Sequence, residues 1–138
     1  MVEIERTHAE FRAERESLGL SQRDVAEALD VQERSVRRWE DPGFPYLPPE
    51  DAWQYLADMR ERYDARVAEA LAFVGDAAEE AGKPPKTVTM TYYRSQREYD
   101  DLGREEGAYG LSNAMTREVA AKLRGMGCNV VISFLDEN

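Results

Sequence analysis

One short stretch of this sequence carries the residue types that bind phosphates and base edges. Residues 31–39 (VQERSVRRW) contain Arg34, Arg37 and Arg38 against one acid, Glu33, in a chain whose net charge is −10 at pH 7. A guanidinium donates paired hydrogen bonds to a phosphate or to the O6 and N7 atoms of guanine. Three arginines also fit a solvated helix face that is bridged to neighbouring acids. Residue types alone therefore fit two interpretations, a surface that binds nucleic acid and a solvated helix face.

Other kinds of chemistry find little support in the composition. A single cysteine, Cys128, excludes an internal disulfide and a multi-cysteine metal cluster, and the only histidine, His8, is expected to have a structural or surface role. An enzyme needs a convergent polar site, and the remaining candidates are scattered carboxylates that fit a solvated loop: Asp100, Asp101, Glu105 and Glu106. We therefore expect a protein that is not an enzyme and that uses no catalytic residue, metal or cofactor.

Length and composition restrict the class of protein further. The chain has 138 residues, which fits one domain or two very small ones, with 42% apolar and 33% charged residues. No apolar run approaches the roughly 18 residues of a spanning helix, and the first residues are acidic and polar, unlike a signal peptide. We expect a cytoplasmic protein without membrane contact. The acidity argues against a nucleic-acid coat protein, but it is compatible with a local basic face.

Three short helices are expected to position the arginine stretch. Residues 3–17 are rich in alanine, glutamate and arginine and form the first helix. Ser21 opens the second helix through a capping box with Asp24, and small apolar residues line one face of that helix. The third helix runs from about residue 32 to 40, and Val36 lies on its buried side. The arginines then fall on the outer side of the third helix.

Two proline-rich segments divide the chain. DPGFPYLPP at 41–49 forbids a continuous helix, and AGKPPK at 81–86 ends the helix that follows. Residues 49–81 form one long helix with a proline in its first turn, which continues from an N-terminal domain of residues 1–60. Residues 86–138 then form a small second domain, which we expect to mediate dimerisation.

This C-terminal segment has the pattern β-α-α-β. Threonines alternate with larger residues in 87–93 (TVTMTYY), which predicts a half-buried strand. Ser95 starts a second capping box (SQRE) before a short helix, and residues 112–124 form another helix. The final run, NVVISFL at 129–135, is apolar and β-branched, which predicts a strand buried on both faces. The expected fold class is α+β, mostly α.

Residues 18–40 (LGLSQRDVAEALDVQERSVRRWE) have the layout of a helix-turn-helix: a capped helix, a tight turn and a second helix with few apolar residues outside. The stretch resembles the Xre family of Cro and phage-repressor type regulators, in which LGLSQ opens the first motif helix and W-E ends the second. The resemblance spans about residues 8–60. Asp30 stands where the family usually has glycine, which is tolerable because aspartate adopts positive φ more readily than most residues. The usual E-x-G ending is replaced by EDPG at 40–43.

The resemblance implies double-stranded DNA as the partner of the N-terminal domain. It assigns base reading to four side chains of the third helix, namely Gln32, Glu33, Arg34 and Arg38. It assigns contacts with the DNA backbone to a second set, namely Ser21, Gln22, Arg23 and Arg37. The chemistry agrees, because arginine pairs with guanine, glutamine with adenine, and glutamate accepts from cytosine N4.

Two functions follow from the resemblance. The first is a sequence-specific transcriptional regulator, a repressor, that binds a palindromic operator as a homodimer. The segment YYRSQREYDD at 92–101 is similar to small dimeric anti-CRISPR-associated repressors, and pairing of two copies would complete a sheet that is marginal with two strands. The alternative is an antitoxin that represses its own operon and binds a toxin partner. An antitoxin tail often needs its partner to fold, whereas residues 129–135 are suited to a stable core.

Overall fold

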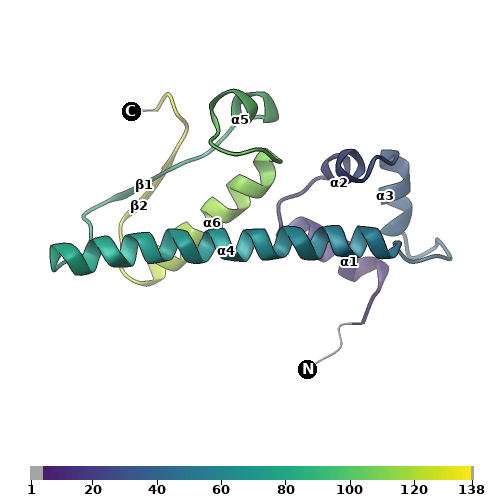
Figure 1. The fold of residues 1–138 in the computed structure, drawn as a ribbon, viewed down its shortest axis with the longest axis horizontal. Helices are drawn as coiled ribbons and strands as arrows, with labels where there is room; N and C mark the ends of the chain where they lie inside the picture. Colours follow the sequence, from purple (N-terminus) through teal and green to yellow (C-terminus); the bar gives the residue numbers. More distant parts are fainter. Residues whose placement is uncertain (1–4, 138) are drawn as a thin grey trace. The chain divides into compact units, whose positions relative to one another are not determined.

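The structure, a computed structural model, describes residues 5–137 (Figure 1). The elements follow in the order α1 (His8–Ser17), α2 (Gln22–Leu29), α3 (Glu33–Trp39), α4 (Glu50–Ala81), β1 (Val88–Thr91), α5 (Gln96–Leu102), α6 (Tyr109–Gly125) and β2 (Val130–Ser133). They form two compact units, of which unit 1 ends at Glu61 and unit 2 begins at Arg62, within α4. The expected α+β class, mostly α, is confirmed.

The first helix of unit 1 is shorter than the sequence pattern predicts. The hydroxyl of Thr7 accepts a hydrogen bond from the backbone N–H of Glu10 at 2.9 Å, so Thr7 caps the helix and α1 begins at His8. The predicted start at residue 3 is therefore wrong for residues 5–7, and residues 3 and 4 lie outside the described residues. The helix stops near Gly19, whose φ of 74° places it in the left-handed region.

The second helix begins as predicted. The Ser21 hydroxyl accepts from the Asp24 backbone N–H at 2.9 Å, and the Asp24 carboxylate accepts from the Ser21 N–H at 2.8 Å, which completes the capping box. The long helix α4 also forms, and it starts one residue after Pro49, whose carbonyl accepts from the N–H groups of Ala52 and Trp53. Short-range capping therefore determines both helix starts.

Phe11 lies at the centre of the core of unit 1. Its ring meets those of Trp39 and Trp53 edge to face, with centroid distances of 5.9 and 5.2 Å, so it joins α1 to α3 and to the first turns of α4. Its side chain is fully buried, and the other large buried apolar residues of this unit are Leu18, Leu20, Val25, Val36 and Leu56. The core thus holds together all four helical segments that unit 1 contains.

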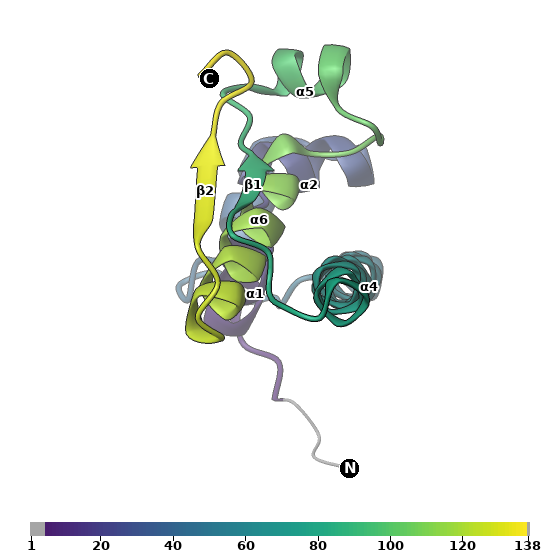
Figure 2. The same cartoon turned by 90° about the vertical axis from the view of Figure 1, so that its left-hand side faces the viewer.

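Unit 2 contains a two-stranded parallel sheet covered by α6. Val88 pairs with Val130, and the register continues to Thr91 and Ser133. The strands are parallel because α5 and α6 form the crossover between them, as parallel pairing requires. Figure 2 shows the two strand arrows pointing the same way beside α6. The predicted β-α-α-β order is confirmed.

Polar contacts fasten the helices of unit 2 to the sheet and to each other. The side chain of Asn113, buried in α6, donates to the carbonyl of Tyr93 at 2.8 Å and accepts from its N–H at 3.0 Å, which fixes the chain just after β1. The Tyr63 hydroxyl of α4 lies 3.3 Å from the carbonyl of Ala114 and 3.1 Å from the carboxylate of Glu118, both in α6. The second half of α4 is thereby attached to α6.

Three expectations for unit 2 need correction. The helix predicted from residue 112 begins earlier, at Tyr109. The capping box at Ser95 is half formed, because its hydroxyl accepts from the Glu98 N–H while the Glu98 carboxylate accepts from the Arg94 N–H instead. The last strand is not buried on both faces, because Val130 is 6% exposed whereas its neighbour Val131 remains 44% exposed.

Candidate nucleic-acid interface

The turn between α2 and α3 determines how the second motif helix leaves the first. Asp30 has φ of 54° and ψ of 48°, so the residue that replaces the family glycine does adopt the left-handed conformation. The N–H of Val31 donates to the carbonyl of Ala26 at 3.0 Å, and the N–H of Asp30 donates to the carbonyl of Glu27 at 3.3 Å. This pair of bonds is a Schellman motif, which ends α2 and turns the chain into α3.

The helix α3 presents its charged side chains to solvent. Val36 is fully buried, and Ser35 and Trp39 are half-buried, so one side of this seven-residue helix faces the core. The rest of the helix surface carries the five candidate DNA contacts of this helix and of its N-cap, all of them exposed: Gln32, Glu33, Arg34, Arg37 and Arg38. The structure therefore brings together the predicted base-reading residues on one accessible surface.

The arginines of α3 differ in the contacts they make within unit 1. Arg37 lies 3.7 Å from Glu33, one turn earlier, and both side chains are about half exposed. Arg38 lies over the ring of Phe44, with 6.0 Å between its guanidinium carbon and the ring centroid. Arg34 has no hydrogen-bond or ion-pair partner among residues 5–137. Exposed contacts of these kinds are worth about 0–1 kcal/mol each, so a phosphate or a base can replace them.

The candidate DNA-backbone residues at the start of α2 form a second group. Ser21 is exposed, and Arg23 donates to Glu27 at 3.0 Å in an exposed pair that raises the pKa of its guanidinium. Gln22 is half-buried, and its amide donates to the carboxylate of Glu40 at 3.2 Å. Gln22 thus has a structural contact in addition to its place at the helix start.

A buried ion pair fixes the end of α3 to α1. Arg15 donates to the two carboxylate oxygens of Glu40 at 2.6 and 2.8 Å and to the carbonyl of Leu20 at 2.9 Å. The two side chains are only 10% and 4% exposed. The hydrogen bonds from Glu40 raise the pKa of the Arg15 guanidinium, since they stabilise its charged form. Both charges are thus fully compensated inside the domain.

Sequence reasoning missed this pair, whereas for His8 it expected a structural or surface role without naming a partner. The Nδ1 atom of His8 lies 2.6 Å from the carbonyl oxygen of Trp39, the last residue of α3, so His8 has a structural contact. An available signal was the W-E ending of the motif, which places an acid directly after the last apolar residue of α3. An arginine in a helix has no distinguishing pattern, however, so the identity of the partner could not be read from spacing.

Across residues 5–137, no group of three or more histidine, cysteine or acidic side chains is placed to hold a metal ion. None of the helices described is both long enough and apolar enough to cross a membrane.

The comparison with known families agrees with this geometry. Residues 11–40, from Phe11 in α1 to Glu40 after α3, match a helix-turn-helix family model (HTH_3). No curated protein matches the chain. The match and the arrangement of α2, turn and α3 define a helix-turn-helix domain of the DNA-binding regulator type within unit 1.

Proposed function

We propose that the protein is a transcriptional repressor that binds a palindromic operator as a homodimer. The observation that carries the proposal is the exposed surface of α3. Three arginines of this helix are exposed, while its Val36 is buried in the core of unit 1. A recognition helix enters the major groove with such side chains directed at the bases. The resemblance of residues 92–101 to small dimeric repressors points the same way.

The contacts divide between base reading and backbone binding. Arg34 and Arg38 lie four residues apart on α3 and bind guanine, while Gln32 and Glu33 at its start read adenine and cytosine. The phosphates are bound by the second set, namely Ser21, Gln22, Arg23 and Arg37. Acidity elsewhere in the chain, with its net charge of −10, limits non-specific binding.

Dimerisation follows from the size of the reading surface. One recognition helix reads too few base pairs for selectivity in a genome, so two copies bind half-sites about 34 Å apart, one turn of DNA. Residues 86–138 are the segment that we assign to self-association. The same segment weighs against an antitoxin, because unit 2 has a core of its own that includes Tyr99, Leu111, Val119, Leu123 and Val130.

Selection of bound sites from a random DNA pool tests the proposal, and we expect an inverted repeat. Arg34→Ala and Arg38→Ala should each weaken operator binding by about 1–3 kcal/mol and relax the preference at one position of each half-site. Arg37→Ala should weaken binding to operator and to random DNA alike. It should also reduce the slope of log affinity against log salt concentration by about one unit.

A matched control is Arg12→Ala, which removes an exposed arginine of α1 that also lies near an acid one turn away, Glu16. It should leave the sequence preference unchanged. Equal losses on operator and random DNA for Arg34→Ala, Arg37→Ala and Arg38→Ala would contradict the assignment of base-reading residues. The absence of any enriched sequence would contradict the proposed function.

A further inference from the structure

The most exposed large apolar side chain of the described residues is Phe73, on the part of α4 that belongs to unit 2. It is 75% exposed, although large apolar side chains are normally covered. It lies at the edge of a groove of about 800 Å³ between α4, β1, α5 and α6. The exposed Leu102 and Leu135 also line this groove, so the apolar surface extends beyond a single residue. Exposed apolar side chains that line one groove mark a candidate interaction site.

Phe73 belongs to a stripe along one face of α4. Arg66, Phe73 and Glu80 are spaced by seven residues, which is about 20° short of two full turns, so the three side chains project from the same face. Between them lie Ala70 and Ala77, whose small side chains leave space beside the phenyl ring. A large residue flanked by small ones is a pattern that allows close helix packing.

The stripe is complementary to itself when a second helix runs antiparallel. A two-fold axis at Phe73 brings residues equally far from it on the two helices together, and Arg66 and Glu80 are each seven residues away. Both arginine–glutamate contacts then form at once, about 10 Å on either side of the aromatic pair. Isologous dimers need such a surface, since the same patch must meet itself.

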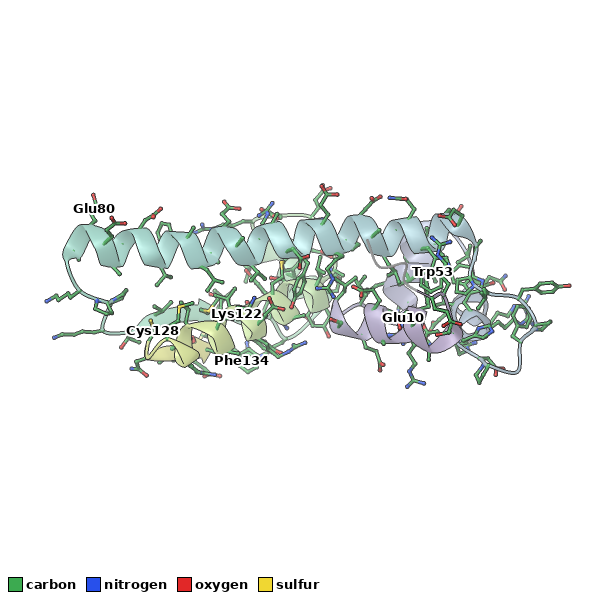
Figure 3. The ribbon with its side chains drawn as sticks, turned by 90° about the horizontal axis from the view of Figure 1, so that it is seen from below. Glu10, Trp53, Glu80, Lys122, Cys128 and Phe134 are labelled. Atoms are coloured by element: carbon green, nitrogen blue, oxygen red, sulfur yellow. The ribbon has the colours of Figure 1, made fainter. Side chains whose placement is uncertain are left out.

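The two charged ends of the stripe are available for this contact. Glu80 is exposed and has no hydrogen-bond or ion-pair partner among residues 5–137, and Figure 3 shows it pointing away from α6. Arg66 contacts Glu105 and lies 4.0 Å from Glu69, yet its side chain is 42% exposed. A guanidinium has five N–H donors, so Arg66 can donate to a further carboxylate.

The groove is lined by apolar side chains and also by charged ones, among them Arg66, Glu69 and Glu105. Ligand sites use a few convergent polar groups to orient their occupant. In the part of the chain that the structure describes, every buried side-chain nitrogen or oxygen already has a hydrogen-bond partner. The apolar part of the lining includes Val74 on α4 and Met115 on α6, so it can hold an apolar side chain.

We propose that residues 66–80 of α4 form a docking face for a second copy of this chain, which packs antiparallel with Phe73 against the partner's Phe73 at the mouth of the groove. Arg66 then pairs with the partner's Glu80, and Glu80 with the partner's Arg66. The inference rests on the proposed homodimer and moves the centre of its interface from residues 86–138 to α4. The segment 86–138 contributes the far walls of the groove.

The test measures the dimer dissociation constant of the full-length protein by analytical ultracentrifugation. Phe73→Ser should raise it by at least about tenfold, as expected for a central aromatic residue. Met126→Ser is the matched control, because Met126 is also a large apolar residue of unit 2, 69% exposed, and lies outside the stripe. Glu80→Arg should also weaken the dimer, whereas Arg66→Glu combined with Glu80→Arg restores it. Glu79→Arg, one residue away on another face, should have little effect.

A second measurement does not depend on how well the charge variants fold. In a Cys128→Ser background, which removes the only native cysteine, Phe73→Cys should cross-link two chains under a mild oxidant, because the two thiols meet at the symmetry axis. Glu79→Cys should not.

The outcomes separate this inference from the proposed function. A protein that remains dimeric with Phe73→Ser and does not cross-link at position 73 would overturn the docking face and leave the homodimer in place. A wild-type protein that is monomeric at all concentrations would overturn both, whereas sequence-specific DNA binding is judged by site selection alone.

Discussion

Removal of Arg15 is expected to lower the stability of unit 1 strongly, even though the residue lies outside α2 and α3. Arg15→Met leaves the Glu40 carboxylate buried, 4% exposed, with the amide of Gln22 at 3.2 Å as its remaining side-chain partner. Breaking a buried pair by removing one partner costs about 3–5 kcal/mol. A unit of this size has a total stability of about 3–9 kcal/mol, so the substitution consumes a large part of it.

Tryptophan fluorescence during urea unfolding measures this effect selectively, because both tryptophans, Trp39 and Trp53, belong to unit 1. The double variant Arg15→Met with Glu40→Leu should be far more stable than the two single losses together imply, since no uncompensated charge remains. Arg12→Met is the matched control, because Arg12 is exposed and contributes at most about 1 kcal/mol through Glu16. A loss below about 1 kcal/mol for Arg15→Met, or strictly additive losses in the double variant, would refute this reasoning.

Three further predictions concern backbone conformation and charge. Asp30→Gly should stabilise unit 1 by about 0.5–1 kcal/mol and Asp30→Val should destabilise it, both in urea unfolding followed by tryptophan fluorescence, because φ is 54° there. Gly103→Ala should lower the stability of unit 2 by about 1–3 kcal/mol in thermal melts, because the new Cβ would lie 2.5 Å from a carbonyl oxygen. Gly75→Ala should instead raise the stability by up to about 1 kcal/mol, because no atom lies within 4 Å of its new Cβ. Hydrogen bonding to Arg66 lowers the pKa of Glu105, so this contact stabilises unit 2 at neutral pH. The stabilisation is lost as the pH falls below about 4.3, the ordinary pKa of a glutamate. In circular-dichroism melts, Glu105→Gln should therefore reduce the fall in melting temperature at acid pH.

The features that could be predicted from the sequence are those that depend on neighbouring residues. The capping box of Ser21 and Asp24, the left-handed Asp30 and the burial of Val36 each follow from a few adjacent positions. The exposure of the α3 arginines follows from the same periodicity, because a seven-residue helix with one buried position directs most of its side chains outward. These local rules determine the surface that we assign to DNA.

Contacts between distant residues could not be predicted in this way. Arg15 and Glu40 are 25 residues apart, and no spacing rule joins them. The exposure of Val131 depends on which face of the sheet is covered, and an apolar run alone does not reveal that one of its faces stays accessible. The start of α1 at His8 also depends on Thr7, a cap that the alanine-rich and glutamate-rich pattern around it obscured.

The structure separates the residues that would read DNA from those that hold α3 in place. A seven-residue helix is too short to be stable alone, so α3 depends on Val36, on the ring contacts of Trp39 and on Glu40 just after its end. All of these are turned toward the core, while Arg34 and Arg38 contribute little to folding. Under the proposed function, we expect substitutions on the outer face to change specificity at almost constant stability, and a change at Glu40 to alter fold and binding together.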